Sequence, residues 1–162
     1  MRKLALFLGL SMLLTAAATA DVRRYPLPNN STFPIAQAVE VSSGNLVFLS
    51  GATPLPANVN AEQGTPAYYG DTETQTVSVL NRIKANLEGM GMKFGDIIKL
   101  TVFLVGDPAL EDRMDFGGFM AGYTQFFGTD EQPNLPARSA FQIAGLGSPL
   151  MFVEIEAIAV RD

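Results

Sequence analysis

The chain has 162 residues and a formal net charge of −5, and it contains neither cysteine nor histidine. Disulfide bonds, thiolate nucleophiles, Ser-His-Asp triads and the usual zinc sites are therefore excluded. Any catalysis must use carboxylates, arginine, lysine, hydroxyls, backbone groups or water. The acidic residues show no metal-loop spacing, and we expect neither a metal nor another cofactor.

The first 20 residues predict a secretory signal peptide. Arg2 and Lys3 precede an apolar run over residues 4–14, and small residues follow up to position 20. A basic start, a short apolar segment and an Ala-x-Ala cleavage site are typical of signal peptides, and the run is too short to span a bilayer. We expect a periplasmic or secreted protein that begins at Asp21 and has no membrane contact after cleavage. An N-terminal anchor that is never cut is the alternative.

The remaining 142 residues suit one domain with a real core. They carry nine basic and 16 acidic side chains, a formal net charge of −7. Such a chain repels phosphate backbones unless it has a local basic patch, and no basic cluster follows Arg23-Arg24. Nucleic acid is therefore not an expected partner.

The first part of the mature chain predicts two strands. Residues 21–33 are polar and proline-rich and suggest an extended lead-in, so the folded domain is expected over residues 34–162. Within it, residues 37–41 and 46–50 are predicted strands joined by a Ser-Ser-Gly-Asn turn. Residues 52–70 follow neither a helical nor a strand period and predict a long loop.

Two amphipathic helices are predicted, one on each side of an apolar strand at residues 97–105. The first begins with a capping-box sequence at Thr72 and ends at Gly91. The second begins at Asp107-Pro108, and we interpret its aromatic stripe as ordinary core rather than a cofactor site. The apolar positions with helical spacing are Val77, Leu80, Ile83, Leu87 and Met90 in the first helix and Phe116, Met120, Tyr123 and Phe127 in the second.

Charged residues stand inside the apolar strands at the end of the chain. Over residues 151–160 the odd positions are all apolar, whereas the even positions include Glu154 and Glu156. In the strand predicted just before it, over residues 138–144, Arg138 lies on the opposite face from Ser139. If the two strands pair as an antiparallel hairpin through residues 145–149, Arg138 and a glutamate could share one face. Because unpaired buried charges are costly, these residues are candidates for function.

The predicted order is β-β-α-β-α-β-β, in which two helices cover one face of a single sheet. The other face would still expose a large apolar surface, from residues 97–105 and from Phe152, Ile158 and Val160 in the last strand. This surface is too large for a monomer, so a second subunit is expected to cover it.

Four segments of the chain resemble the RidA (YjgF) family of reactive-intermediate deaminases. This resemblance covers nearly all of the chain after residue 33 and implies an α+β, chorismate-mutase-like fold. It also implies a homotrimer in which three sheets surround a central barrel, with sites in the clefts between neighbours. The matching segments are NLVFLSGATP from Asn45, GDIIKLTVFLVGD from Gly95, PARS from Pro136 and VEIEAIAV from Val153.

The resemblance assigns roles to individual residues. Arg138 would hold the substrate carboxylate, and Glu154 would orient or activate water at an imine carbon. Ser50 and Gly51 would line the pocket with a hydroxyl and a backbone N–H, while Glu156 is interpreted as structural. Judged on spacing alone, Arg138 could instead pair only with one of the two glutamates, and Ser50 could simply end a strand.

Three predicted substrate-binding positions depart from the family pattern and make the pocket more apolar. Ile35 replaces a tyrosine, Met120 an asparagine and Ala140 a cysteine. Two functions therefore remain open. The first is hydrolysis of small 2-enamine or 2-imine acids to 2-oxo acids and ammonia. The second is a non-catalytic trimer that binds small carboxylates in the same cleft. A ribonuclease activity, sometimes attached to this family, is disfavoured by the negative charge and the absence of histidine.

Overall fold

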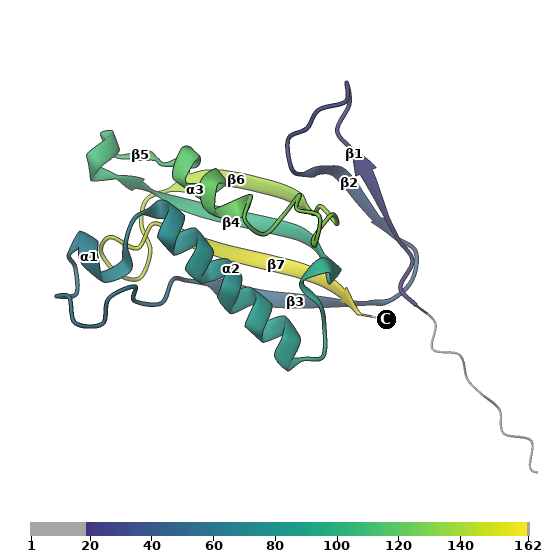
Figure 1. Ribbon diagram of the computed structural model, residues 1–162, viewed down its shortest axis with the longest axis horizontal. Helices are drawn as coiled ribbons and strands as arrows, with labels where there is room; N and C mark the ends of the chain where they lie inside the picture. The colour runs from purple at the N-terminus through teal and green to yellow at the C-terminus, as the bar shows by residue number, and fades with distance from the viewer. Residues whose placement is uncertain (1–18, 162) are drawn as a thin grey trace, which may run out of the picture.

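A single mixed sheet in the strand order β1-β2-β6-β4-β7-β3 organises the protein, and the computed structural model describes residues 19–161 (Figure 1). The predicted signal peptide lies almost wholly outside these residues. A two-residue strand, β5, pairs with the end of β4. The strands are β1 (Val22–Pro26), β2 (Ala36–Val41), β3 (Asn45–Ala52), β4 (Ile97–Asp107), β5 (Arg113–Met114), β6 (Ala137–Ile143) and β7 (Val153–Arg161).

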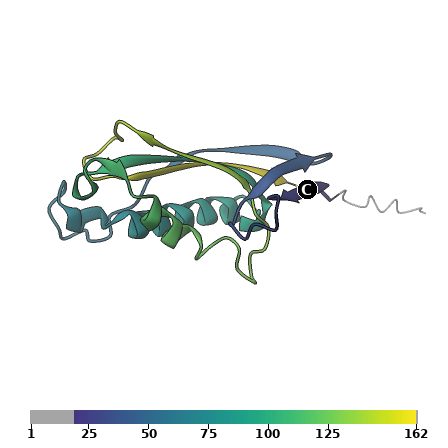
Figure 2. The same ribbon diagram turned by 90° about the horizontal axis from the view of Figure 1, so that it is seen from above.

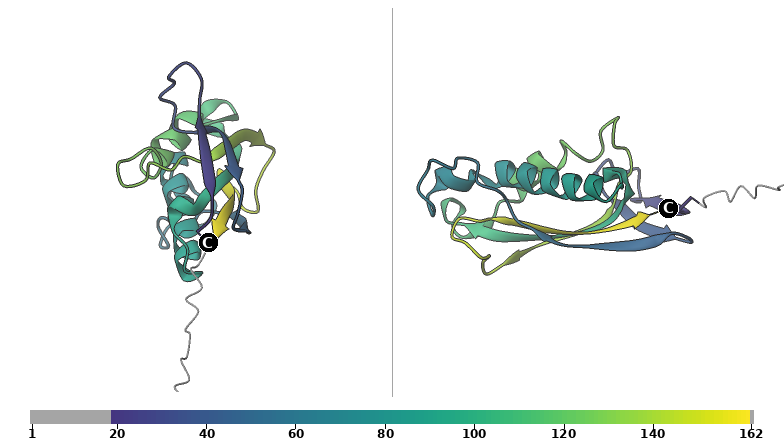
Figure 3. Two further views of the ribbon diagram at one scale, coloured as in Figure 1. Left: turned by 90° about the vertical axis from the view of Figure 1, so that its right-hand side faces the viewer. Right: turned by 90° about the horizontal axis from the view of Figure 1, so that it is seen from below.

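Two helices, α2 (Thr72–Gly89) and α3 (Phe116–Tyr123), lie on the same face of the sheet, as Figure 2 shows edge-on. This arrangement confirms the predicted α+β fold with its helices on one side. Figure 3 shows the same layering from below, with no helix on the opposite face. The shorter helical segments are α1 (Pro66–Tyr69), η1 (Phe94–Asp96) and η2 (Pro108–Leu110).

The hydrophobic core lies between α2, α3 and the inner face of β4 and β7. The side chain of Asp71, one residue before the predicted capping box, accepts a hydrogen bond from the backbone N–H of Thr74 at 2.8 Å and starts α2. Gly91 follows the helix with a φ of 73°, a left-handed conformation that glycine adopts without strain. Residues buried in this core include Val79, Leu80, Ile83 and Leu87 from α2 and Leu100, Val102, Ile155 and Ala157 from the sheet.

The predicted hairpin between the last two strands is wrong, because β4 lies between them. It pairs in parallel with β6 on one side and antiparallel with β7 on the other. As a strand that is apolar on both faces, β4 suits a central position. The loop from β6 to β7 passes β4, and the buried side-chain amide of Gln75 holds the end of this loop. The amide donates to the carbonyl of Leu150 at 2.9 Å and accepts from the N–H of Phe152 at 2.6 Å.

The second helix begins at Phe116, later than predicted. Asp107 caps only the short turn η2, by accepting from the N–H of Ala109 at 2.8 Å. The chain then passes through Glu111 and Asp112, which have φ values of 58° and 57° and cannot continue a right-handed helix. A second aspartate, Asp115, starts α3 by accepting from the N–H of Gly118 at 2.8 Å.

The N-terminal segment is more ordered than a plain lead-in. Residues 22–26 form β1, which pairs antiparallel with β2, and this pair extends away from the main body of the sheet in Figure 1. Only one pair of residues, Ala36 and Ala137, joins β2 to β6. The predicted long loop at residues 52–70 is largely irregular, although it includes the single turn of α1.

The sheet face without helices, which we call the open face, carries exposed aromatic rings among polar side chains such as Lys99 and Thr101. Phe48 of β3 is 71% exposed and Phe141 of β6 is 42% exposed. The rings of Phe141 and Phe103 pack edge to face with their centroids 5.1 Å apart. Such a surface on an isolated chain marks an interaction site.

Candidate active site

The two residues predicted to act together, Arg138 and Glu154, lie on opposite faces of the sheet. In the strand register, Arg138 is paired with Leu100, which is fully buried beneath the helices. Glu154 is paired with Phe103, whose ring lies on the open face. Paired residues in neighbouring strands point to the same face, so the two charged side chains diverge. Within one chain they can form neither an ion pair nor a single site.

The guanidinium of Arg138 is surrounded by aromatic rings, which we call the aromatic cage. Its central carbon, Cζ, lies between 4.4 and 5.8 Å from four ring centroids, within the range of cation–π attraction. A guanidinium N–H also contacts the sulfur of Met120 at 3.3 Å. The cage consists of Tyr123 at 4.4 Å, Phe119 at 4.9 Å, Phe33 at 5.3 Å and Phe116 at 5.8 Å.

The cage is assembled from two distant parts of the chain. Helix α3 carries three of its rings at a spacing of three and four residues, which places them on one side of the helix. The phenol of Tyr123 donates a hydrogen bond to the carbonyl of Pro34 at 2.9 Å. This bond fixes the segment before β2 against the helix, and it thereby places the ring of Phe33 beside Arg138.

Arg138 has no ion-pair partner among residues 19–161. Burial lowers its pKa, an effect that the neighbouring Tyr123 opposes, but an arginine keeps its charge at any physiological pH. Burial also raises the pKa of Tyr123, so this phenol stays neutral. A half-buried cation without an ion-pair partner among the described residues is suited to bind an anion, and the fork of a guanidinium matches a carboxylate in particular.

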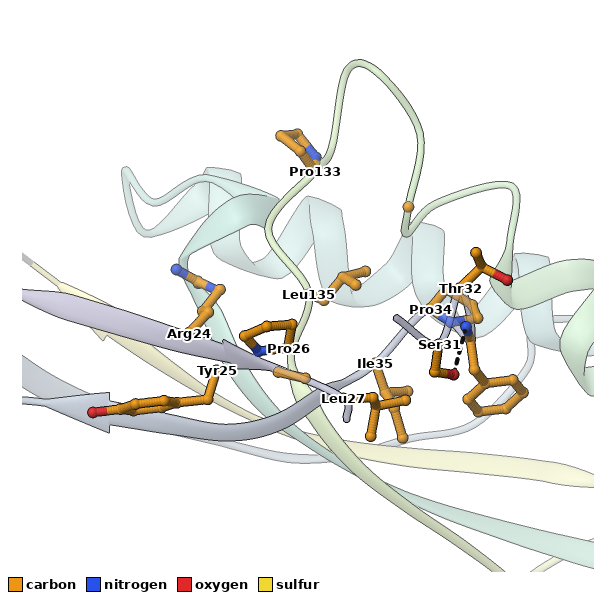
Figure 4. A pocket seen from close by; sticks show the side chains of 13 residues that line it. Arg24, Tyr25, Pro26, Leu27, Ser31, Thr32, Pro34, Ile35, Pro133 and Leu135 are labelled. Atoms are coloured by element: carbon orange, nitrogen blue, oxygen red, sulfur yellow. Dashed lines mark hydrogen bonds between the residues drawn. The ribbon is translucent and has the colours of Figure 1, made fainter. Parts of the chain in front are cut away.

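Three other predicted binding residues lie near Arg138. Met120 touches the guanidinium, and Ala140 lies two residues along β6 on the same face. Ile35 comes just before β2, where the N–H of Ala36 bonds to the carbonyl of Pro136 at 3.0 Å. Ile35 and Phe33 both line a cavity of about 400 Å³ between the β1–β2 segment and residues 128–135 (Figure 4).

The remaining predicted residues gather around Glu154, on the other side of the sheet. A bulge in β3 between Leu49 and Ala52 carries Ser50 and Gly51. A Cβ atom at Gly51 would overlap Oε1 of Glu154, so the carboxylate occupies the space that the glycine leaves free. Glu156 is exposed and pairs in register with Thr101. The predicted residues therefore form two half-sites: one around Arg138 and one around Glu154.

The sequence did not predict the four rings of the Arg138 half-site, which belong to Phe33, Phe116, Phe119 and Tyr123. The aromatic stripe of α3 was assigned to the core, which is correct for the fully buried Tyr123 and incomplete for Phe116, which is 36% exposed. The signal available was a run of aromatic residues at helical spacing. Nothing in that spacing showed that the stripe would lie over Arg138.

Residues 19–161 contain no cluster of three or more acidic side chains that could hold a metal ion. Within the same residues, no helix has both the length and the apolar character needed to cross a membrane.

Comparison with known proteins gives consistent matches. The family model described as Endoribonuclease L-PSP matches residues 30–161. A RutC family protein of Haemophilus influenzae is 40% identical over 79% of this chain and 87% of its own length. The 2-iminobutanoate/2-iminopropanoate deaminase of Escherichia coli is 39% identical over 79% of this chain and 88% of its own length. The crystal structure of a Rid family protein of unknown function, YyfB from Yersinia pestis, superposes with a TM-score of 0.65 at 25% identity, covering 86% of this chain and 98% of that one.

Proposed function

Because the chain belongs to the RidA (YjgF) family, we propose that it hydrolyses small 2-enamine and 2-imine acids to 2-oxo acids and ammonia. The observation that carries this proposal is the half-buried guanidinium of Arg138, which has no carboxylate partner among the described residues. The named activity of the E. coli relative supplies the reaction type.

The proposed enzyme is a homotrimer whose active sites lie between neighbouring subunits. Two observations support this assembly. The half-sites around Arg138 and Glu154 face opposite sides of one sheet, so only two different copies of the chain can bring them together. The open face also exposes the large aromatic rings of Phe48 and Phe141, which a neighbouring subunit would cover.

In the proposed reaction each half-site has a separate task. Arg138 of one subunit holds the substrate carboxylate through two parallel hydrogen bonds. Glu154 of the neighbour positions a water molecule against the imine carbon and accepts its proton. The new C–O bond gives a carbinolamine, and protonation of its nitrogen allows ammonia to leave as the carbonyl forms. Ser50 and the backbone of Gly51 lie beside the carboxylate of Glu154 and complete that side of the pocket.

The direct test is an imine-hydrolysis assay on the mature protein. An amino-acid oxidase generates 2-iminopropanoate or 2-iminobutanoate, and decay is compared with and without the protein. Arg138→Ala should abolish binding and turnover, and Arg138→Lys should restore little because ammonium lacks the planar fork. Glu154→Gln should leave binding intact and lower turnover by ~10²–10⁴-fold.

Mixing the two inactive variants tests the shared site. If each site takes Arg138 from one subunit and Glu154 from the next, co-assembled Arg138→Ala and Glu154→Gln chains contain intact pairs at about one site in four. Activity should therefore return to roughly a quarter of the wild-type value, whereas separately folded variants mixed without subunit exchange stay inactive. A co-assembled mixture without activity would contradict the intersubunit site.

The second candidate function is a trimer that binds small carboxylates without turnover. The observation that favours it is the replacement of polar groups near Arg138, where Met120 contacts the guanidinium through sulfur and Ala140 has no functional side chain. Binding through Arg138 with no imine hydrolysis above background would establish this function instead.

We also propose that the protein is exported, with the first 20 residues removed. N-terminal sequencing of the exported form should begin at Asp21. An intact Met1 on the mature protein would contradict the periplasmic or secreted location.

A further inference from the structure

We infer that the Arg138 half-site selects carboxylates with a large apolar substituent, aromatic or branched, over those with a methyl-sized one. For the substrate this means 2-imino acids derived from aromatic and branched amino acids. The reaction itself rests on the proposed function, but the selectivity rests on the surroundings of Arg138 alone.

The first observation is the uneven burial of the aromatic cage. Its inner rings, Phe119 and Tyr123, are fully buried, whereas Phe33 remains 38% exposed and Phe116 is almost equally exposed. The guanidinium thus lies between a buried apolar wall and two partly exposed rings. A ligand whose carboxylate meets Arg138 lies beside these rings, and an apolar substituent would remove them from water.

The second observation is the mainly apolar character of the groups around the guanidinium. The side chains that contact it are the four cage rings and the thioether of Met120. The one hydroxyl among them, on Tyr123, already donates its hydrogen to Pro34. Apart from the Tyr123 oxygen, which lies against Arg138, a hydroxyl or amide on the ligand would lose its water without gaining a partner among these side chains, which is unfavourable. This side of the site therefore disfavours polar substituents.

The third observation is that apolar side chains are also present beyond the cage. Phe33 also lines the cavity of about 400 Å³ formed with residues 128–135. Figure 4 shows side chains of the β1–β2 segment and Leu135 gathered around this space. The lining of this cavity is mixed: its apolar side chains include Pro26, Leu27, Pro34, Ile35 and Leu135, and its polar side chains include Arg24, Ser31 and Thr32. A large substituent next to Phe33 therefore meets more apolar surface, whereas a methyl group would leave both outer rings exposed.

The test measures binding and turnover with substituents of increasing size. Calorimetry compares pyruvate, 4-methyl-2-oxopentanoate and phenylpyruvate, which share one carboxylate and are stable products of the proposed reaction. Phenylpyruvate should bind at least ~10-fold more tightly than pyruvate, since a single methylene in an apolar pocket is already worth about 10-fold. The kcat/KM values for imines generated from phenylalanine, leucine and alanine should follow the same order.

Variants of the outer rings locate the selectivity. Phe33→Ala and Phe116→Ala should each lower the phenylpyruvate-to-pyruvate affinity ratio by at least ~3-fold. Phe33→Leu, which keeps an apolar side chain in the same segment, should retain part of the preference. Leu110→Ala is the matched control, because Leu110 is 39% exposed and lies outside the cage. Arg138→Lys should weaken binding of all three acids.

The outcomes separate this inference from the proposed function. Equal or tighter binding of pyruvate would overturn the selectivity, even if every imine is hydrolysed. A preference that survives both Phe33→Ala and Phe116→Ala would overturn it as well. Tight phenylpyruvate binding through Arg138 without hydrolysis of any imine would refute the deaminase proposal and uphold the selectivity.

Discussion

The two faces of the sheet are formed by alternate residues of the same strands, but their surroundings are very different. The inner face is covered by α2 and α3, and its residues Leu100, Val102 and Ile155 are fully buried. The open face also carries large apolar residues, but two of them, Phe48 and Phe141, remain exposed in the single chain. Each face also holds one half-site. The difference shows that this chain covers one face of its sheet itself, and it supports the proposal that a neighbouring subunit covers the other.

A charge placed on the open face should have the largest effect. In Phe48→Asp a carboxylate replaces an exposed ring, and burying that charge against a neighbour would be costly. We expect loss of the assembled species in sedimentation and loss of imine hydrolysis, because each proposed site needs two subunits. Val59→Asp is the control, since Val59 is 77% exposed in the loop after β3. An active, fully assembled Phe48→Asp protein would contradict the proposed interface.

A methyl group at Gly51 should disable the Glu154 half-site without unfolding the chain. The new Cβ overlaps Oε1 of Glu154, and the carboxylate can avoid it by rotating away. Because a catalytic group displaced by about 1 Å can cost ~10²-fold, Gly51→Ala should lower turnover by about that factor. Its thermal midpoint should stay close to that of the wild type. Gly147→Ala should keep full activity, because the added Cβ would meet no neighbouring side chain or backbone within 4 Å.

A core truncation on the inner face should destabilise the chain, unlike a truncation on the open face. Leu80 is fully buried in α2, and Leu80→Ala should lower the free energy of unfolding by ~2–5 kcal/mol in urea titrations. Phe141→Ala on the open face should change the stability of dissociated chains far less, because its ring is 42% exposed. Similar losses for both variants in the monomer would show that the open face is already covered within one chain.

The smallest effect concerns the ionisation of Tyr123. Burial raises its pKa, so the folded chain holds this proton more tightly than the unfolded chain does. The resulting stabilisation is fully present below the ordinary tyrosine pKa of about 10 and is lost as the pH rises through the raised value. In an ultraviolet titration, one of the four tyrosines should resist ionisation until the protein unfolds. Tyr123→Phe should remove the late ionisation from the titration curve.

Helices and strands could be predicted where neighbouring residues alone determine them. Helix α2 could be located because its apolar residues repeat with the helical period and Gly91 ends the run. The start of α3 could not, because Asp107-Pro108 is a valid helix start that here caps only a turn. The left-handed residues Glu111 and Asp112 interrupt the chain after that turn, and no strong sequence preference marks them.

The sequence by itself determined the family, the α+β class, and which residues share a face of their own strand, because the period-two alternation of a strand is written in neighbouring residues. Only the tertiary structure decided that β4 separates β6 from β7, and hence that Arg138 and Glu154 face opposite sides. It also decided that Phe33 and three rings of α3 surround Arg138. These contacts join segments far apart in the chain, and their pairing depends on how whole layers pack rather than on any local pattern.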